Sequence, residues 1–151
     1  MSKIIGITGW KDVGKTHYAS LIIESLVKKG YHVGSIKHAH HDFDIDKPGT
    51  DSFKHREAGS SQVVISSAKR WAKITENNNE NEKSLDELIQ EFNNVEIIVV
   101  EGFKKDNHPK IEILTNGLVN RNKETKNVIA IVSGDLKDNI IPVFKENDIE
   151  N

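Results

Sequence analysis

Residues 9–16 read GWKDVGKT and follow directly on the apolar run KIIGIT at residues 3–8. The octapeptide matches the pattern G-x-x-x-x-G-K-[ST], with Gly9, Gly14, Lys15 and Thr16 at its defined positions. In such a loop the backbone N–H groups surround phosphate, the lysine reaches the terminal phosphates and the hydroxyl binds Mg²⁺. A strand before the pattern and a helix after it are the setting that it requires. The stretch therefore predicts a phosphate-binding loop.

The segments on either side of this loop predict how the chain folds. Apolar residues recur at helical spacing over 15–29, and a β-branched run follows at 31–37, which predicts a strand–loop–helix–strand unit with parallel strands. We expect an α/β fold of the P-loop NTPase type: a mostly parallel sheet flanked by helices, with an additional β-hairpin. The other expected strands are 62–66 and 70–75, which form the hairpin, 95–100, 111–114, 128–132 and 140–144; the other expected helices are 51–58, with Asp51 as N-cap, and 84–92.

The composition narrows the class of protein. The chain has 151 residues, enough for a single nucleotide-binding domain over 1–151, and no cysteine, which excludes disulfides and thiolate metal sites. A formal net charge of -2 provides no basic field for nucleic acid. The apolar runs fall far short of the ~20 residues of a membrane span, and residues 1–5 lack the features of a secretory signal. We expect a cytoplasmic protein that binds neither nucleic acid nor membrane.

A carboxylate is expected to complete the phosphate site. Residues 97–100 read IIVV and are followed by Glu101 and Gly102. The carboxyl ends of parallel strands meet at one edge of a sheet, where α/β proteins bind their ligands, so Glu101 is expected beside the phosphate loop. There it would orient a Mg²⁺-bound water or the attacking water. We assign it as a metal and catalytic residue.

A second polar segment leaves the strand at 31–37. Residues 37–51 read KHAHHDFDIDKPGTD and are expected at the same sheet edge. Asp42 or Asp44 could join Thr16 in holding Mg²⁺, and Asp42 is our assignment; an EF-hand is excluded because its glycine and final glutamate are missing. A transition-metal site and a solvated loop are the alternatives. The residues assigned to an anionic second ligand are Lys37, His38, His40 and His41.

Taken together, these segments resemble a known family. GWKDVGKT at 9–16, IKHAHHDFDIDKPGTDS at 36–52, RWA at 70–72 and VVEGFK at 99–104 are similar to MobB, the molybdopterin-guanine dinucleotide biosynthesis adaptor family. The resemblance implies a homodimeric GTP-binding P-loop protein that uses Mg²⁺. It also implies work with a MobA-like guanylyltransferase, which attaches GMP to molybdopterin, and a functional surface at 37–51 near the nucleotide or the pterin.

The residues do not identify the base of the nucleotide, and guanine is implied by the resemblance alone. GTPases recognise guanine through Asn-Lys-x-Asp, but residues 122–125 read NKET and follow no expected strand, so we treat that match as coincidence. Asp135, after the strand at 128–132, is a better placed acceptor for the base. The residues assigned to the nucleotide are Gly9, Trp10, Lys11, Asp12, Val13, Gly14, Lys15, Thr16, His17 and Asp135.

Three functions fit these patterns. The leading one is an accessory GTP-binding protein of molybdenum cofactor biosynthesis with weak GTPase activity, because Arg56, Arg70 and Arg121 offer no obvious arginine finger. The alternatives are an ATP-dependent small-molecule kinase, in which the histidine–aspartate loop binds the acceptor, and a metallochaperone NTPase that carries a cation on its histidines. Trp71 is expected in the core or, if it is exposed on an edge strand, at a dimer contact.

Overall fold

The computed structural model describes residues 2–39, 42–77, 81–115, 120–137, 140–145 and 147–148. The chain divides into two compact units: Met1–His38 with Leu85–Asn151 forms the first, and Ala39–Ser84 forms the second. A six-stranded sheet belongs to the first unit and a two-stranded sheet to the second. The expected single nucleotide-binding domain over 1–151 stays a prediction.

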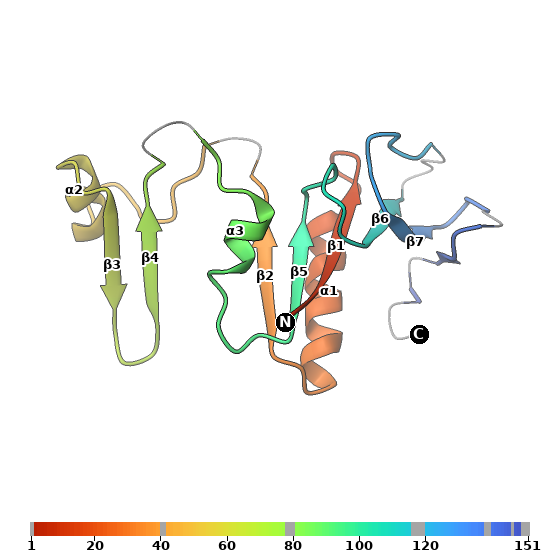
Figure 1. The fold of residues 1–151 in the computed structure, drawn as a ribbon, viewed down its shortest axis with the longest axis horizontal. Coiled ribbons are helices and arrows are strands. Elements are labelled where there is room, and N and C mark those ends of the chain that lie inside the picture. The colour runs from red at the N-terminus through yellow and green to blue at the C-terminus, as the bar shows by residue number, and fades with distance from the viewer. Residues whose placement is uncertain are drawn as a thin grey trace. The chain divides into compact units, whose positions relative to one another are not determined.

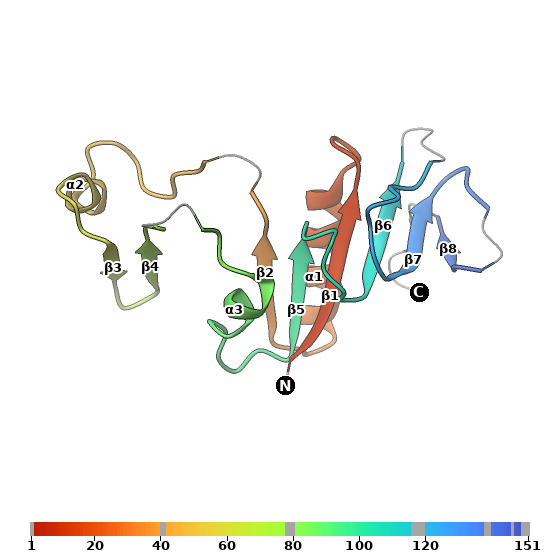
Figure 2. The same ribbon diagram turned by 45° about the horizontal axis from the view of Figure 1, so that its top comes forward.

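The first unit is a parallel α/β sheet with a glycine loop after its first strand. Its elements are β1 (Lys3–Gly9), α1 (Lys15–Lys28), β2 (Val33–Lys37), α3 (Leu85–Ile89), β5 (Ile97–Glu101), β6 (Lys110–Leu114), β7 (Val128–Ser133) and β8 (Val143–Phe144). All six strands pair in parallel, in the order β2-β5-β1-β6-β7-β8. Their carboxyl ends therefore lie at one edge, as the arrowheads of β2, β5, β1 and β6 in Figure 2 show.

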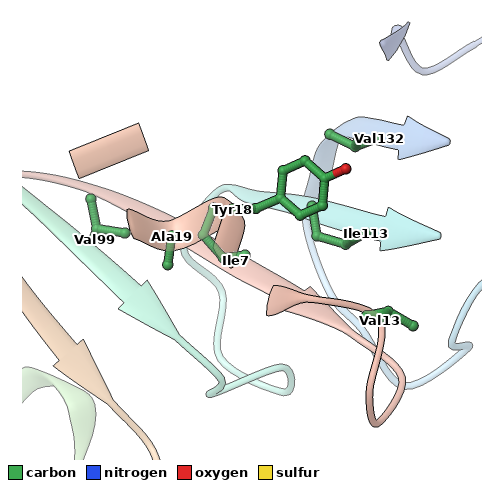
Figure 3. Close-up of a cluster of buried hydrophobic side chains, with 7 residues drawn as sticks. All are labelled: Ile7, Val13, Tyr18, Ala19, Val99, Ile113 and Val132. Atoms are coloured by element: carbon green, nitrogen blue, oxygen red, sulfur yellow. The ribbon is translucent and has the colours of Figure 1, made fainter. Parts of the chain in front are cut away.

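Two helices cover opposite faces of this sheet (Figure 1). Successive residues of β5 point to opposite faces, so Val99 packs with α1 while Ile98 and Val100 pack with α3. Val13, in the phosphate loop itself, is 3% exposed and joins the core on the α1 face, which ties the loop to the sheet. The buried cluster on that face, drawn in Figure 3, comprises Ile7, Val13, Tyr18, Ala19, Val99, Ile113 and Val132.

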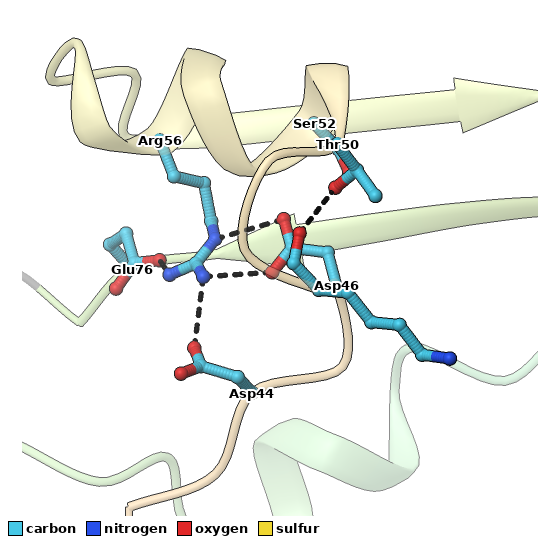
Figure 4. A network of polar contacts seen from close by, with 7 residues as sticks. Asp44, Asp46, Thr50, Ser52, Arg56 and Glu76 are labelled. Atoms are coloured by element: carbon cyan, nitrogen blue, oxygen red, sulfur yellow. Dashed lines mark hydrogen bonds and ion pairs between the residues drawn. The ribbon is translucent and has the colours of Figure 1, made fainter.

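The second unit consists of α2 (Asp51–Glu57) and an antiparallel hairpin of β3 (Gln62–Ser66) and β4 (Trp71–Thr75). Arg56 of α2 is its main polar anchor: the guanidinium donates to Asp44 and Asp46 of the preceding loop and to Glu76 after β4 (Figure 4). The arginine thereby joins the loop, the helix and the hairpin. The same contact holds the pKa of Asp46 below its usual range.

The expected fold is confirmed: a mostly parallel sheet flanked by helices, with an additional hairpin. Some boundaries differ from expectation. Asp51 is not the N-cap of α2, because Thr50 takes that extended position (φ -72, ψ 160) and Asp51 lies in the first helical turn. The strand expected at 140–144 is only Val143–Phe144, which follows Pro142, a residue without an N–H group for a ladder.

Two further boundaries are shifted inward. The strand expected from residue 31 begins at Val33, because the Tyr31 N–H donates to the Leu26 carbonyl and closes the end of α1. The helix expected over 84–92 is Leu85–Ile89, and the N–H groups of Glu91 and Phe92 bond to carbonyls only three residues back, as at a tightening helix end. No helix in the described ranges combines the length and apolar character needed to cross a bilayer.

Candidate nucleotide-binding site

The phosphate loop connects β1 to α1, and its two glycines are required for different reasons. A Cβ at Gly9 would lie 2.6 Å from the Ile113 carbonyl oxygen and 2.9 Å from Val13 Cγ2, so no side chain fits there. Gly14 is the N-cap of α1 with φ 86, a left-handed conformation that other residues adopt only with strain. The Thr115 hydroxyl donates to the Val13 carbonyl at 2.8 Å and fixes the middle of the loop.

The amino terminus of α1 is suited to an anion. The helix has no side-chain cap and no acidic residue in its first turn, so no side chain of α1 or its N-cap takes up its leading N–H groups. These groups and the positive end of the helix dipole favour phosphate at this position. The expected role of Gly9–Thr16 in holding phosphate therefore has the required backbone geometry.

Lys15 bends back over the loop. Its Nζ donates to the Trp10 carbonyl oxygen at 2.5 Å. Burial lowers the pKa of Lys15 from its usual value; the carboxylates of Glu101 and Asp12 oppose this shift, and Lys37 adds to it. The ammonium thus lies above the loop on a carbonyl that it could exchange for a phosphate oxygen.

Thr16, Glu101 and Lys37 meet at the carboxyl edge of the sheet. The Thr16 hydroxyl lies 2.9 Å and 3.0 Å from the two carboxylate oxygens of Glu101. Lys37 Nζ lies 3.2 Å from the Thr16 hydroxyl and 3.3 Å from Glu101 Oε1. A hydroxyl and a carboxylate side by side are the hard oxygen donors that suit Mg²⁺. The structure thus brings together Thr16 and Glu101, two of the three expected magnesium residues.

The turn after Glu101 depends on a close approach between two strands. Gly102 has φ 103, and a Cβ there would lie 2.7 Å from His38 Cβ. The His38 N–H donates to the Glu101 carbonyl at 2.9 Å, and the His38 ring stacks on Phe103 with centroids 4.5 Å apart. His38, expected to bind a second ligand, therefore lies directly beside Glu101 and packs on an aromatic ring.

A buried acid next to the loop was not anticipated from sequence. Glu112, in the middle of β6, is 0% exposed and accepts from Arg121 Nε and the Asn122 N–H, each at 2.9 Å. These two contacts hold residues 120–122 close to the phosphate loop, where Trp10 Nε1 donates to the Asn120 carbonyl at 2.9 Å. A single acid within the otherwise apolar strand residues IEIL was the available signal, because such a buried charge requires a partner.

Asp135 lies in the turn that follows β7, at the same edge of the sheet. The Ser133 hydroxyl, which is almost fully buried, accepts from the N–H groups of Asp135 at 3.3 Å and of Leu136 at 3.1 Å and so shapes this turn. Asp135 itself is exposed. Its expected contact with the base stays a prediction.

The histidine–aspartate loop belongs to the second unit from Ala39 onward. Asp42 is described there as an exposed residue, and its expected part in a magnesium site stays a prediction. His40 and His41 lie outside the described residues. Asp44 and Asp46 are engaged by Arg56. Within the described ranges no group of three or more histidine, aspartate or glutamate side chains is placed to hold a metal ion.

Comparison with known proteins identifies the family. Residues 4–134 match the family described as MobB, molybdopterin guanine dinucleotide synthesis protein B. A molybdopterin-guanine dinucleotide biosynthesis adapter protein of Escherichia coli is 36% identical over 99% of this chain and 89% of its own length. One from Haemophilus influenzae is 40% identical over 82% of this chain and 66% of its own length.

Solved structures agree with the observed fold. The crystal structure of Bacillus subtilis MobB has a TM-score of 0.76 at 23% identity and covers 97% of this chain and 91% of its own. A MobB homologue from Bacillus stearothermophilus has a TM-score of 0.67 at 19% identity, with coverage of 94% and 86%. At these identities the structures support the fold, while the family follows from the sequence match over 4–134 and the Escherichia coli relative. The chain therefore belongs to the MobB family.

Proposed function

We propose that this protein is a GTP-binding adapter of molybdopterin guanine dinucleotide synthesis. The observation that carries the nucleotide part is the contact between the Thr16 hydroxyl and the Glu101 carboxylate, made beside an uncapped helix terminus and Lys15. The adapter part is supported by relatives named molybdopterin-guanine dinucleotide biosynthesis adapter proteins. In this proposal the protein is cytoplasmic and serves a MobA-like guanylyltransferase that acts on molybdopterin.

The nucleotide is placed by the chain's own groups. The N–H groups of Gly9–Thr16 and the first turn of α1 surround the phosphates, and Lys15 leaves the Trp10 carbonyl to meet the terminal phosphates. Thr16 and Glu101 would hold Mg²⁺, which neutralises phosphate charge when it is bound. Asp135, in the turn shaped by Ser133, is the proposed acceptor for the guanine edge. Lys37 and His38 remain the proposed contacts to an anionic second ligand.

Hydrolysis by this site alone should be slow. Glu101 can orient a water molecule, but two of the three arginines are engaged elsewhere: Arg121 is bound to Glu112 and Arg56 to three carboxylates of the second unit. GTPases without an arginine finger hydrolyse GTP slowly. The proposed role is therefore that of an adapter with weak GTPase activity, whose main contribution is to hold nucleotide for a partner enzyme.

We include a homodimer in the proposal. In the hairpin, Trp71 is 69% exposed and Val64 is 62% exposed, and the described residues give this sheet two strands. An exposed tryptophan on a strand with an open edge is expected to become buried against another chain. Of the two sequence-based expectations for Trp71, burial in the core of this chain is therefore wrong.

Calorimetric titration with GTP and then with ATP, each with Mg²⁺, tests the nucleotide assignment. Strong preference for GTP is the expected result, and Lys15→Ala should abolish binding while leaving the circular dichroism spectrum unchanged. Unchanged affinity in that variant would remove the phosphate-loop assignment. A preference for ATP would instead favour a small-molecule kinase. Co-purification of the GTP-loaded protein with a guanylyltransferase, absent for Lys15→Ala, tests the adapter role.

A further inference from the structure

We propose that the ammonium group of Lys37 occupies the cation position of the phosphate site in the nucleotide-free protein, so that Mg²⁺ must displace it. The inference rests on the proposed nucleotide site and adds a residue that regulates it. Lys37 would act as an internal competitor that keeps the site neutralised when it is empty and sets the Mg²⁺ concentration at which nucleotide binds.

Lys37 contacts the same two oxygen atoms that are proposed to bind Mg²⁺. Lys37 Nζ contacts both Thr16 Oγ1, at 3.2 Å, and Glu101 Oε1, at 3.3 Å. The Thr16 hydroxyl donates its proton to Glu101, so Lys37 must use one of its lone pairs. A direct bond to Mg²⁺ of about 2.0–2.1 Å would need a lone pair of the same oxygen. The hydroxyl has a second lone pair, but an ammonium 3.2 Å from this oxygen and Mg²⁺ about 2 Å from it would place two positive charges within a few ångströms of each other. The two cations therefore compete for these donors.

The backbone of Lys37 is held in the sheet, while its side chain is mostly exposed. Lys37 is the last residue of β2 and lies opposite Glu101 in the parallel register, and the next N–H donates to the Glu101 carbonyl at 2.9 Å. Its side chain is 61% exposed, whereas that of Glu101 is 14% exposed. A flexible lysine stem can thus swing into solvent at little cost when a stronger cation arrives, while the carboxylate stays in place.

The two lysines of the site have different partners. Lys15 Nζ donates to the Trp10 carbonyl, and Lys37 Nζ contacts the Glu101 carboxylate. Lys37 is thus the counter-ion of the carboxylate that is proposed to hold the metal. Lys15 does not contact that carboxylate and is proposed to bind phosphate. A different role, in which Lys37 binds the nucleotide phosphates directly, predicts the opposite effect of its removal: weaker nucleotide binding at every metal concentration.

The test is a titration of the full chain with Mn²⁺, followed by electron paramagnetic resonance, at saturating guanosine 5′-(β,γ-imido)triphosphate. Lys37→Met should lower the half-saturating Mn²⁺ concentration by about two- to five-fold, which is the strength of an exposed ion pair. Lys37→Arg, which keeps a cation at this position, should stay near wild type. Lys29→Met, which removes an exposed lysine at the other end of α1, is the matched control and should also stay near wild type.

The same titration in the Glu101→Gln background distinguishes competition for the carboxylate from a general effect of positive charge. If Lys37 competes for the carboxylate, removing it should have no effect once that carboxylate is gone; a persistent effect would overturn the proposal. An unchanged or raised half-saturation for Lys37→Met in the wild-type background would also overturn it, while leaving the nucleotide site intact. Failure of the wild-type chain to bind the imidotriphosphate with Mn²⁺ or Mg²⁺ would overturn the proposed function and this inference together.

Discussion

The Thr16 hydroxyl lies 2.9 Å from the Glu101 carboxylate although 85 positions separate the two residues. The contact follows from the parallel pairing of β1 with β5, which places Glu101 opposite Ile7 at the strand ends, just before the chain turns into α1. Two oxygen donors that suit Mg²⁺ therefore lie side by side. Such a preformed pair reduces the reorganisation needed when Mg²⁺ and nucleotide bind.

Replacing Glu101 by glutamine tests this pair. The variant keeps the shape of the side chain but loses its charge, so affinity for GTP in the presence of Mg²⁺ should fall by about tenfold. In EDTA the loss should be small, because Glu101 is proposed to act through the metal. Calorimetry under both conditions measures the difference, and an equal loss in both would show that Glu101 does not act through a metal ion.

Replacing Gly9 by alanine tests the packing of the phosphate loop. The new Cβ would press on the Ile113 carbonyl, and we expect a loss of about 2–4 kcal/mol in the free energy of unfolding. Gly30→Ala is the matched control, since Gly30 also has positive φ (90) but nothing within 4 Å of the new Cβ. It should lose only about 1–2 kcal/mol. Urea unfolding of both variants measures the two losses in unfolding free energy. Equal losses would mean that Gly9 is needed for its φ alone.

His108 should make folding sensitive to acid. It is 9% exposed, and neither ring nitrogen has a hydrogen-bond partner within the described part of the chain. Burial lowers its pKa to about 4, with Lys110 adding to the shift and Asp106 opposing it. An unfolded histidine binds a proton near pH 6.5, so between pH 6.5 and 4 the unfolded state holds more protons. Stability should therefore fall as the pH falls through this window.

The variant His108→Gln, which does not titrate, isolates that contribution. The difference in unfolding free energy between wild type and variant should change by at most about 3 kcal/mol from pH 6.5 to pH 4, with wild type losing more on acidification. Urea unfolding at a series of pH values provides the measurement. Parallel pH profiles for the two proteins would mean that His108 contributes nothing to the acid sensitivity.

Arg56 should hold the second unit together. Its guanidinium contacts Asp44, Asp46 and Glu76, and Asp46 is nearly buried, so Arg56→Met should leave this carboxylate without its cation. Limited proteolysis is expected to cut residues 42–50 much faster in this variant. Arg56→Lys should rescue poorly, because an ammonium cannot reproduce the forked geometry. Lys54→Met removes an exposed pair with Asp51 at 3.4 Å and should digest like wild type.

Trp71 should contribute to self-association. If the exposed face of the hairpin is the dimer contact, Trp71→Ser should raise the dimer dissociation constant by roughly thirtyfold, as expected for a tryptophan hot spot. Light scattering after size-exclusion chromatography over a range of protein concentrations measures this dissociation constant. Exposed Lys29, at the carboxyl end of α1 and outside the hairpin, provides the control Lys29→Ser. A wild-type chain that is monomeric throughout would contradict the dimer, and a Trp71→Ser dimer of normal strength would place the contact elsewhere.

Much of the fold could be predicted because its signals are local. The glycine loop, the helical spacing after it and the β-branched runs each occupy a few consecutive residues, and the observed elements lie within a few positions of the expected ones. The boundaries that differed depend on single backbone groups, such as the Tyr31 N–H that closes α1 and the Pro142 nitrogen that has no proton. Patterns of hydrophobicity do not report these groups.

The sequence by itself determined the phosphate loop, since Gly9–Thr16 are contiguous and the loop conformation depends on its own glycines. The sequence also predicted that Glu101 lies at the carboxyl edge of the sheet, because the carboxyl ends of parallel strands meet at one edge. Only the tertiary structure decided which charged groups pair. Glu101 contacts Lys37, Asp44 and Asp46 are engaged by Arg56, and buried Glu112 holds Arg121. Ion pairs depend on distances of a few ångströms between side chains that are 9 to 64 positions apart, and residue order alone does not set those distances.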